Sequence, residues 1–290
     1  MEASARADQQ KANVKASFTK RPLSEAIGVE IQGIDLSQPL NESTFAAIQD
    51  AWFDHNVLLF RDQDISEEAQ IRFARYFGPL KSAIFSTTAT PPGPVMLVSN
   101  IRKDGKPIGE LPDGEMWFHS DQCYTERPCA GATLYAIELP SRGGNTLFAN
   151  MYAAYETLPK PMQSRLAGLR AMHVYDYHLN SIAQNQAPSA DAPRYAHPIV
   201  RTHPASGRKA LYVNRLMTAY IEGVPAEESR SLLDYLYDHQ EQRKLIYEHV
   251  WRKGDLVLWD NRCTLHARTD FDPNERRLLR RVIVQGEKPV

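Results

Sequence analysis

The order of apolar and polar positions divides the chain into two parts at about residue 79. In the first part, two short apolar runs that indicate strands alternate with two segments of helical period. The strand-like runs are 27–36 (IGVEIQGIDL) and 57–63 (VLLFRDQ). The helical segments are 41–56 and 66–77, and each begins at a residue that can cap a helix, Asn41 or Ser43 in the first and Ser66 in the second.

The second part consists mainly of short apolar runs separated by proline and glycine. They lie at 95–100, 116–124, 130–139, 145–151, 197–203, 209–214, 255–261 and 278–285. Two helical segments, 151–169 and 225–242, interrupt them. Many short strands at modest spacing favour a sandwich or barrel over a sheet built from βαβ units. The pattern therefore predicts a mainly β fold with flanking helices.

No internal repeat, low-complexity segment or interior linker divides this pattern. The first residues contain no apolar run of the kind a secretory signal needs. We expect residues 1–16 to be a flexible tail and residues 17–290 to form a single domain.

Charge and cysteine usage exclude several classes of protein. The 34 basic and 35 acidic residues nearly balance, so no basic surface for nucleic acid or anionic lipid is expected. No stretch of 18 apolar residues is present, which argues against a membrane span. Three cysteines without a CxxC pair are typical of a reducing compartment, and we predict a cytoplasmic protein. Because closed homo-oligomers are common among soluble proteins, we expect a homo-oligomer.

A candidate metal site lies in the β-rich part. His119 and Asp121 occupy positions i and i+2, which project from the same face of a strand. His266, far along the chain in DLVLWDNRCTLHARTDF, is the best third ligand. Two imidazoles and one carboxylate on one face of an octahedral metal form the facial triad of non-haem Fe(II) oxygenases. An isolated HxD match is weak evidence, because most histidines are surface or hydrogen-bonded core residues.

The arginines after His266 strengthen this interpretation. Arg277 and Arg281 share one face of a predicted strand, whereas Arg276 and Arg280 are expected to face solvent. Two inward guanidinium groups require anionic partners, since an uncompensated buried charge costs several kcal/mol. A dicarboxylate co-substrate would supply them through bidentate contacts. The alternative is that Arg277 and Arg281 form surface salt bridges.

These motifs occur within ordered blocks that resemble the taurine and 2,4-dichlorophenoxyacetate dioxygenases, which are Fe(II)- and 2-oxoglutarate-dependent enzymes. The blocks extend from about Leu23 to Pro289 and include AIGVEIQGIDLSQPL, VLLFRDQ, FARYFGPL, FHSDQCY, ELPSRGGNTLFANMYAAYETLP and DLVLWDNRCTLH. The resemblance implies a double-stranded β-helix, or jelly roll. It also implies the cofactors Fe(II), 2-oxoglutarate and O2, with succinate and CO2 as co-products of hydroxylation.

The same resemblance implies roles for individual residues. The iron ligands would be His119, Asp121 and His266. Thr146 and Arg277 would hold the distal carboxylate of 2-oxoglutarate. Arg281 would lie close to the substrate or to the inner carboxylate of the co-substrate, and Trp259 matches an aromatic position near the iron. Asp260 and Asn261, just before His266, are expected to hydrogen-bond within their own turn.

Arg281 favours a small organic substrate with an anionic head group. By the same resemblance, His178 and Tyr212 fall where substrate contacts occur. Two departures argue against taurine: no histidine follows the FGPL turn, and Glu115 stands where the family often has asparagine. Nearby aromatic residues are compatible with an aromatic substrate: Phe85, Trp117, Phe118 and Tyr212.

Two other classes remain open at this point. A metal-dependent hydrolase could use the same three ligands to activate water. A non-catalytic jelly-roll binding protein could keep the fold without the chemistry. The complete ligand set together with both arginines favours the oxygenase, whose hydroxylation could also lead to bond cleavage.

Overall fold

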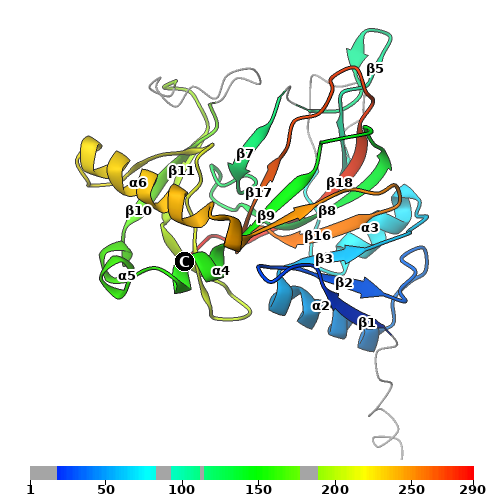
Figure 1. The fold of residues 1–290 in the computed structure, drawn as a ribbon, viewed down its shortest axis with the longest axis horizontal. Coiled ribbons are helices and arrows are strands. Elements are labelled where there is room, and N and C mark those ends of the chain that lie inside the picture. The colour runs from blue at the N-terminus through cyan, green and yellow to red at the C-terminus, as the bar shows by residue number, and fades with distance from the viewer. Residues whose placement is uncertain (1–17, 83–92, 112–113, 177–188) are drawn as a thin grey trace, which may run out of the picture.

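The computed structural model describes residues 18–82, 93–111, 114–176 and 189–290, and within them the chain is mainly β with flanking helices, as predicted (Figure 1). The expected tail 1–16 lies outside the described residues. None of the helices in the described part is long and apolar enough to cross a membrane.

Seven strands of the described residues form the largest sheet, in the order β1-β2-β3-β16-β8-β18-β4. Their bounds are β1 Thr19–Pro22, β2 Val29–Gln32, β3 Val57–Phe60, β16 Leu256–Asp260, β8 Cys129–Glu138, β18 Leu278–Gln285 and β4 Val95–Ser99. All neighbouring pairs are antiparallel except β2 and β3. The central strands are buried on both faces, which explains why they read as nearly continuous apolar runs.

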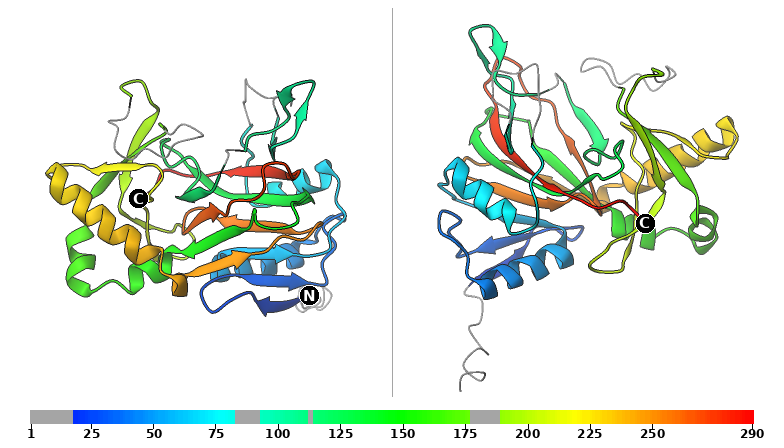
Figure 2. Two further views of the ribbon diagram at one scale, coloured as in Figure 1. Left: turned by 45° about the horizontal axis from the view of Figure 1, so that its top comes forward. Right: turned by 180° about the vertical axis from the view of Figure 1, so that it is seen from behind.

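Two helices, α2 (Glu42–His55) and α3 (Glu67–Arg75), cover the outer face of this sheet (Figure 2). Both predicted caps are confirmed: Asn41 accepts a hydrogen bond from Thr44 N at 2.8 Å, and Ser66 accepts one from Ala69 N at 3.2 Å. Because α3 packs over β18, Arg280 is buried and bonds Gln70 at 2.7 Å, so the prediction that it faces solvent was wrong.

A second sheet faces the inner side of the first. Its order is β15 (Ile246–His249), β9 (Thr146–Asn150), β17 (Thr264–Arg268) and β7 (Met116–His119). Phe148 from β9 packs with Trp259 from β16 and Leu279 from β18, and the two aromatic ring centroids are 5.8 Å apart. The inward faces of the two sheets therefore share one apolar core.

The remaining elements form a second core beside the small sheet. The strands are β10 (Arg170–Val174), β11 (Arg194–Pro198), β14 (Thr218–Ile221), β12 (Val200–Thr202) and β13 (Lys209–Leu211), and the helices are α4 (Met151–Glu156), α5 (Lys160–Leu166), α6 (Ala226–Gln240) and η1 (Arg243–Leu245). The predicted helix 151–169 is thus two helices, because Pro159 cannot continue the first. The predicted stripe of Leu232, Leu233 and Leu236 on α6 is buried in this core.

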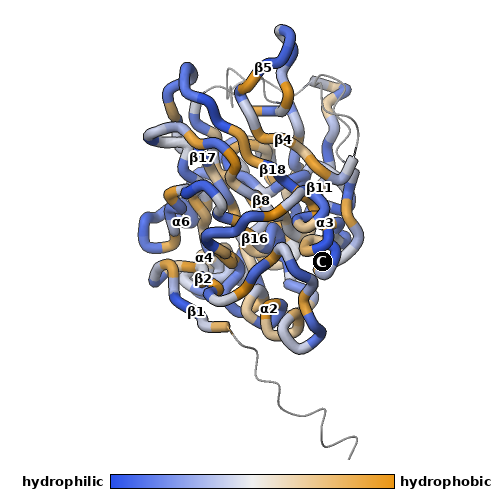
Figure 3. Tube along the Cα trace, turned by 90° about the vertical axis from the view of Figure 1, so that its right-hand side faces the viewer, coloured by the Kyte–Doolittle hydropathy of each residue, from blue (hydrophilic) through white to orange (hydrophobic). Residues whose placement is uncertain are grey.

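A hydrophilic hairpin of β5 (Arg102–Lys103) and β6 (Lys106–Pro107) extends from the body, as Figure 3 shows by its colour. The strands β10, β14 and β15 were not predicted, because their apolar runs are short and irregular. Their pairing with longer neighbours places them in the fold.

Two buried histidines lie in the sheet of β10, β11 and β14. His173 and His197 have ring centroids 5.8 Å apart, and both contact the ring of Tyr212. Burial lowers the pKa of His173 to about 3, with His197 adding to the effect, and burial lowers the pKa of His197 to about 4. Both side chains are therefore neutral in the folded protein at neutral pH.

This pair predicts acid sensitivity. Between each lowered pKa and the ordinary value near 6.5, these histidines are protonated in the unfolded state but not in the folded state. The free energy of unfolding is therefore highest above about pH 6.5 and falls as the pH decreases. Between pH 7 and pH 5, protonation of His173 in the unfolded state should lower the free energy of unfolding by about 2 kcal/mol. In urea titrations, His173→Gln should have a shallower pH dependence than the parent. The difference in unfolding free energy between variant and parent at pH 7.5 measures the loss of packing caused by the substitution. If the unfolding free energies of variant and parent fall in parallel with decreasing pH, the prediction is wrong.

Candidate active site

The pairing of β7 with β17 brings the two predicted histidine ligands together. His119 and His266 are register partners in this antiparallel pair, and their ring centroids are 4.1 Å apart. The strand β7 ends at His119, so the expectation that Asp121 continues it on the same face was wrong. Asp121 instead lies in the following turn, where Gln122 has a φ of 58°. The turn carries the carboxylate back toward the histidines.

The three ligand atoms converge on one buried point. Nε2 of His119 lies 3.7 Å from Oδ1 of Asp121, and Nε2 of His266 lies 3.6 Å from Oδ2. All three ligand atoms lie within 4.8 Å of one another. Nδ1 of His119 is 2.8 Å from the carbonyl oxygen of Trp117 and donates to it, which leaves the lone pair of Nε2 facing the cluster. Two imidazoles and a carboxylate in this arrangement fit an octahedral Fe(II) ion.

The buried side chain of Asn261 holds the turn that carries Asp121. Its Oδ1 accepts a hydrogen bond from Asp121 N at 2.8 Å, and its Nδ2 donates to the carbonyl oxygens of Asp121 and Cys129, each at 3.1 Å. Its backbone carbonyl accepts from the Ser120 hydroxyl at 3.0 Å. The expectation that Asn261 bonds only its own turn was therefore wrong. No local signal could have revealed this contact, because the partners are 140 positions apart.

The charges in the cluster suit metal binding. Burial would raise the pKa of Asp121, but the opposing effects of Arg281, His266 and His119 lower it to about 2. Burial lowers the pKa of His266 to about 3 and also lowers that of His119. At neutral pH the site therefore holds one carboxylate and two neutral imidazoles, which are the forms that coordinate a metal.

Arg281 lies beside this cluster, as its position on β18 predicts. Its guanidinium forms an ion pair with Asp121, and its Cζ lies 5.9 Å from the ring centroid of Trp259. The Trp259 ring is also 5.0 Å from that of His266, which agrees with the expected aromatic position near the metal. A positive charge thus adjoins the ligand set on the inner face of β18.

Arg277 is only 1% exposed, although it precedes β18. One guanidinium nitrogen donates to the Gly144 carbonyl oxygen at 3.1 Å, while Nε and Nη1 have no hydrogen-bond partner among the described residues. A Cβ on Gly144 would come within 3.0 Å of Nε, so this glycine leaves room for the guanidinium. Burial, with a smaller contribution from Arg268, lowers the pKa of Arg277 to about 9, which still leaves it charged. A guanidinium buried in this way favours a bound anion as its partner.

Thr146 begins β9 two residues after Gly144 and is buried. Its hydroxyl oxygen accepts a hydrogen bond from Trp251 Nε1 at 3.0 Å. This contact leaves the hydroxyl hydrogen available for an acceptor such as a carboxylate. Thr146 and Arg277 are thus both held near the Gly144 backbone.

The residues that were predicted to contact the substrate differ in their burial and position. Tyr212 is buried among Cys123, Leu216 and Met217, with Arg201 over its ring at 4.8 Å. Glu115 is exposed just before β7. His178 and Phe85 lie outside the described residues.

Two neighbours of Arg281 were not identified from the sequence. Tyr124 follows the Asp121 turn, is influenced electrostatically by Asp121 and Arg281, and has its ring 4.7 Å from that of Tyr175. Glu110 is half-buried, and burial raises its pKa despite the opposing effect of Arg281. Tyr124 lies in the FHSDQCY block, so its proximity to the site could have been expected.

A second group of potential ligands, His203, Asp260 and Cys263, has a different character. Asp260 binds Arg262 through both carboxylate oxygens at 2.8 and 2.6 Å, and His203 contacts Asp260 Oδ2 at 3.0 Å. Burial raises the pKa of Cys263 well above its ordinary value. Because the carboxylate is already paired and the thiol stays protonated, this group is a buried ion-pair cluster.

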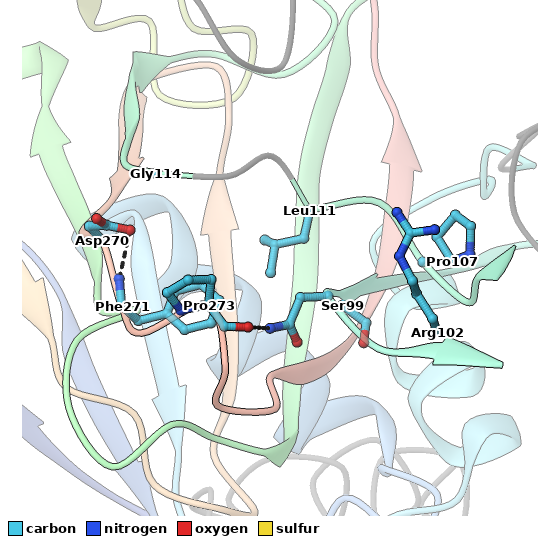
Figure 4. A pocket seen from close by; sticks show the side chains of 10 residues that line it. Ser99, Arg102, Pro107, Leu111, Gly114, Asp270, Phe271 and Pro273 are labelled. Atoms are coloured by element: carbon cyan, nitrogen blue, oxygen red, sulfur yellow. Dashed lines mark hydrogen bonds between the residues drawn. The ribbon is translucent and has the colours of Figure 1, made fainter. Parts of the chain in front are cut away.

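A cavity of about 540 Å³ lies beside Asp270 and Phe271, in the loop that follows β17 (Figure 4). Its wall includes Leu111, Gly114, Phe271 and Pro273. Phe271 also lies 5.9 Å from Cζ of Arg277, measured to the ring centroid. The cavity and the buried arginine thus share an aromatic wall.

Comparisons with known proteins agree with this arrangement. Residues 19–283 match the family model described as taurine catabolism dioxygenase TauD, TfdA family. The α-ketoglutarate-dependent 2,4-dichlorophenoxyacetate dioxygenase of Cupriavidus pinatubonensis is 36% identical over 283 residues, covering 91% of this chain and 96% of that protein. The (S)-phenoxypropionate/α-ketoglutarate dioxygenase of Sphingobium herbicidovorans is 34% identical, covering 93% and 96%.

A solved structure extends the likeness to three dimensions. The crystal structure of AAD-2 in complex with Mn(II) and N-oxalylglycine has a TM-score of 0.81 and 30% identity, and the match covers 94% of this chain and 99% of that one. The sequence and structural matches both span nearly the whole molecule. The chain therefore belongs to the TauD and TfdA family and is an α-ketoglutarate-dependent dioxygenase, with Fe(II), 2-oxoglutarate (α-ketoglutarate) and O2 as its reactants and cofactors.

Proposed function

We propose that His119, Asp121 and His266 hold the Fe(II) ion of this dioxygenase. The observation that carries the proposal is the convergence of their ligand atoms within 4.8 Å at a buried point where burial and charge keep them in coordinating form. When bound, Fe(II) couples the oxidative decarboxylation of 2-oxoglutarate to hydroxylation of the substrate. The protein contributes orientation of the ligands and exclusion of water.

Thr146 and Arg277 bind the distal carboxylate of 2-oxoglutarate in this proposal. The support is the buried guanidinium with two unpartnered nitrogens beside a buried hydroxyl that can still donate. Arg281 supplies the positive charge next to the metal ligands, where the inner carboxylate of the co-substrate or an anionic substrate group lies. Arg277 therefore binds an anionic group at the end of the site away from the metal ligands, and Arg281 binds one at the end beside them.

We also infer that residues 17–290 form a single domain around a double-stranded β-helix. Its support is the chain path, since β7, β8 and β9, and again β15, β16, β17 and β18, alternate between the two facing sheets. Of these, β7, β9, β15 and β17 belong to the small sheet, and β8, β16 and β18 belong to the large one. The shared core of Phe148, Trp259 and Leu279 joins the sheets. Each ligand-bearing strand of the small sheet thus faces a strand of the large sheet.

The substrate is a small organic anion, and an aryloxyalkanoate is the class we favour. Relatives at 36% and 34% identity act on 2,4-dichlorophenoxyacetate and (S)-phenoxypropionate, as their names state. In this chain, Arg281 offers a cation for a carboxylate, and Tyr124, in the turn that carries Asp121, has its ring centroid 4.7 Å from that of Tyr175. Glu115 and the FGPL turn without a following histidine disfavour taurine. Hydroxylation next to an ether oxygen would be followed by cleavage of the ether.

Substrate-triggered succinate formation tests this assignment. After anaerobic reconstitution with Fe(II) and 2-oxoglutarate, the protein should respond to O2 with more succinate in the presence of an aryloxyalkanoate than with an alkyl sulfate or taurine. Reactions without Fe(II) or without organic anion give the background. Efficient turnover of taurine alone would contradict the proposed substrate class but not the metal site.

The contacts of Asn261 predict its effect on metal affinity. Asn261→Ala should weaken Mn(II) binding, measured by calorimetry, by about 10- to 100-fold, since groups that orient a ligand have effects of this size. His119→Ala should abolish binding. Because Asn261 is buried, Ser120→Ala serves as a milder variant that removes only one contact to the same turn. Unchanged affinity in a folded Asn261→Ala protein would refute the positioning role.

The buried position of Arg277 predicts a selective effect on the co-substrate. Arg277→Gln should raise the 2-oxoglutarate concentration for half-maximal turnover by about 100-fold, because a charged hydrogen-bonding partner of the distal carboxylate is removed. The turnover at saturation should fall much less. Arg276→Gln is the matched control, since Arg276 is exposed and pairs with Glu138 at 2.7 Å. Equal effects of both substitutions would contradict the assignment.

A further inference from the structure

The turn that carries Asp121 depends on an uncommon backbone conformation at the next residue. Gln122 has a φ of 58°, in the left-handed region that residues with a side chain seldom adopt. Its carbonyl oxygen accepts two hydrogen bonds from Thr125, one from the backbone N–H and one from the hydroxyl, each at 2.9 Å. The chain therefore reverses direction at Gln122, directly after the proposed metal ligand.

The side chain of Lys81 holds both ends of the loop 122–127. Its ammonium group donates to Oε1 of Gln122 at 2.6 Å and to the carbonyl oxygen of Arg127 at 3.0 Å. Both acceptors are neutral oxygens, and the charge of the donor strengthens each hydrogen bond. A single half-buried lysine thus joins the side chain at the start of the loop to the backbone at its end.

The backbone of Lys81 is anchored to the large sheet. Its N–H donates to the Ile283 carbonyl oxygen at 3.0 Å, and the residue before it forms a β-bridge with Val284. Both partners belong to β18, the strand whose Arg281 forms the ion pair with Asp121. The same strand therefore contacts the Asp121 carboxylate directly and supports the Asp121 turn through Lys81.

Lys81 and Asn261 act on different parts of this turn. Asn261 bonds the backbone N–H and carbonyl oxygen of Asp121 itself, whereas Lys81 bonds the side chain of the next residue. At a positive φ a side chain strains the backbone, and glycine avoids this strain. The hydrogen bond from Lys81 offsets the strain at Gln122, because it forms when the amide lies where the observed turn places it. Without this bond, residue 122 can relax and the Asp121 carboxylate moves with it.

We propose that Lys81 is a positioning residue for Asp121. By binding the Gln122 side chain, it keeps that residue in the left-handed conformation that returns the carboxylate to the two histidines. The inference rests on the proposed function, because it concerns the geometry of the proposed Fe(II) site. Lys81 contributes no ligand atom and acts through Gln122.

Substitutions at both ends of the bond test this role, with Mn(II) binding to the protein measured by calorimetry in the absence of co-substrate. Lys81→Met and Gln122→Met each remove the bond and keep a side chain at position 122. Each should weaken Mn(II) binding by about 10-fold, as expected for a group that orients a metal ligand. Loss of a positive charge alone would strengthen the binding of a cation, so weaker binding of Lys81→Met reports a change in geometry.

Glycine at position 122 provides the rescue. Gln122→Gly removes the bond and the backbone strain together, so its Mn(II) affinity should stay within about twofold of the parent. In the Gln122→Gly background, Lys81→Met should have little further effect. A role of Lys81 in overall stability alone would not produce this difference between methionine and glycine at one position.

Lys288→Met is the matched control. Lys288 contacts the exposed side chain of Glu126 in the same loop at 3.1 Å, so this variant should keep the parent affinity. Urea unfolding midpoints show which metal-free variants are folded. Unchanged affinity in folded Lys81→Met, or an equal loss in the Gln122→Gly background, overturns the proposal.

The pair of Gln122 variants decides the question even if Lys81→Met does not fold. Equal Mn(II) affinities of Gln122→Met and Gln122→Gly would then overturn the proposal, and a weaker affinity of Gln122→Met alone would support it. If the parent protein binds no Mn(II), or if His119→Ala binds it as well as the parent, the proposed metal site itself is wrong.

Discussion

The antiparallel pairing of β7 with β17 is the contact on which the candidate site depends. It places His119 directly opposite His266, although the two residues are far apart in the sequence. The third ligand, Asp121, lies in the turn after β7, and Asn261, which follows β16, holds that turn through hydrogen bonds. A shift of one residue in this register would turn one of the imidazoles to the opposite face of the sheet.

The site concentrates charges that the core would otherwise exclude. Asp121 is paired with Arg281, whereas Arg277 is buried with two nitrogens that lack partners among the described residues. Two other buried carboxylates have cationic partners: Asp260 pairs with Arg262 and contacts His203, and Asp255 pairs with Arg61. An anion bound beside Arg277 would complete this cation, in agreement with the proposed binding of the distal carboxylate.

Predictions from the sequence were most reliable for features that depend only on residues close together in the chain. The caps Asn41 and Ser66 and the apolar run of β3 were confirmed, because capping and strand burial depend on neighbours in the sequence. Predictions of side-chain exposure failed where an element distant in the sequence covers the residue. Arg280 alternates with Arg281 along β18 and was expected to face solvent, but α3 covers that face of the sheet.

The sequence by itself determined which chemical groups are available and which family they belong to, since two histidines, an aspartate and two spaced arginines occur within ordered blocks. Only the tertiary structure decided how they meet. Asp121 reaches the histidines through a turn rather than a strand, and Asn261 holds that turn from another element. Strand pairing and loop contacts act between residues more than a hundred positions apart, and the spacing of residues along the chain does not encode such distances.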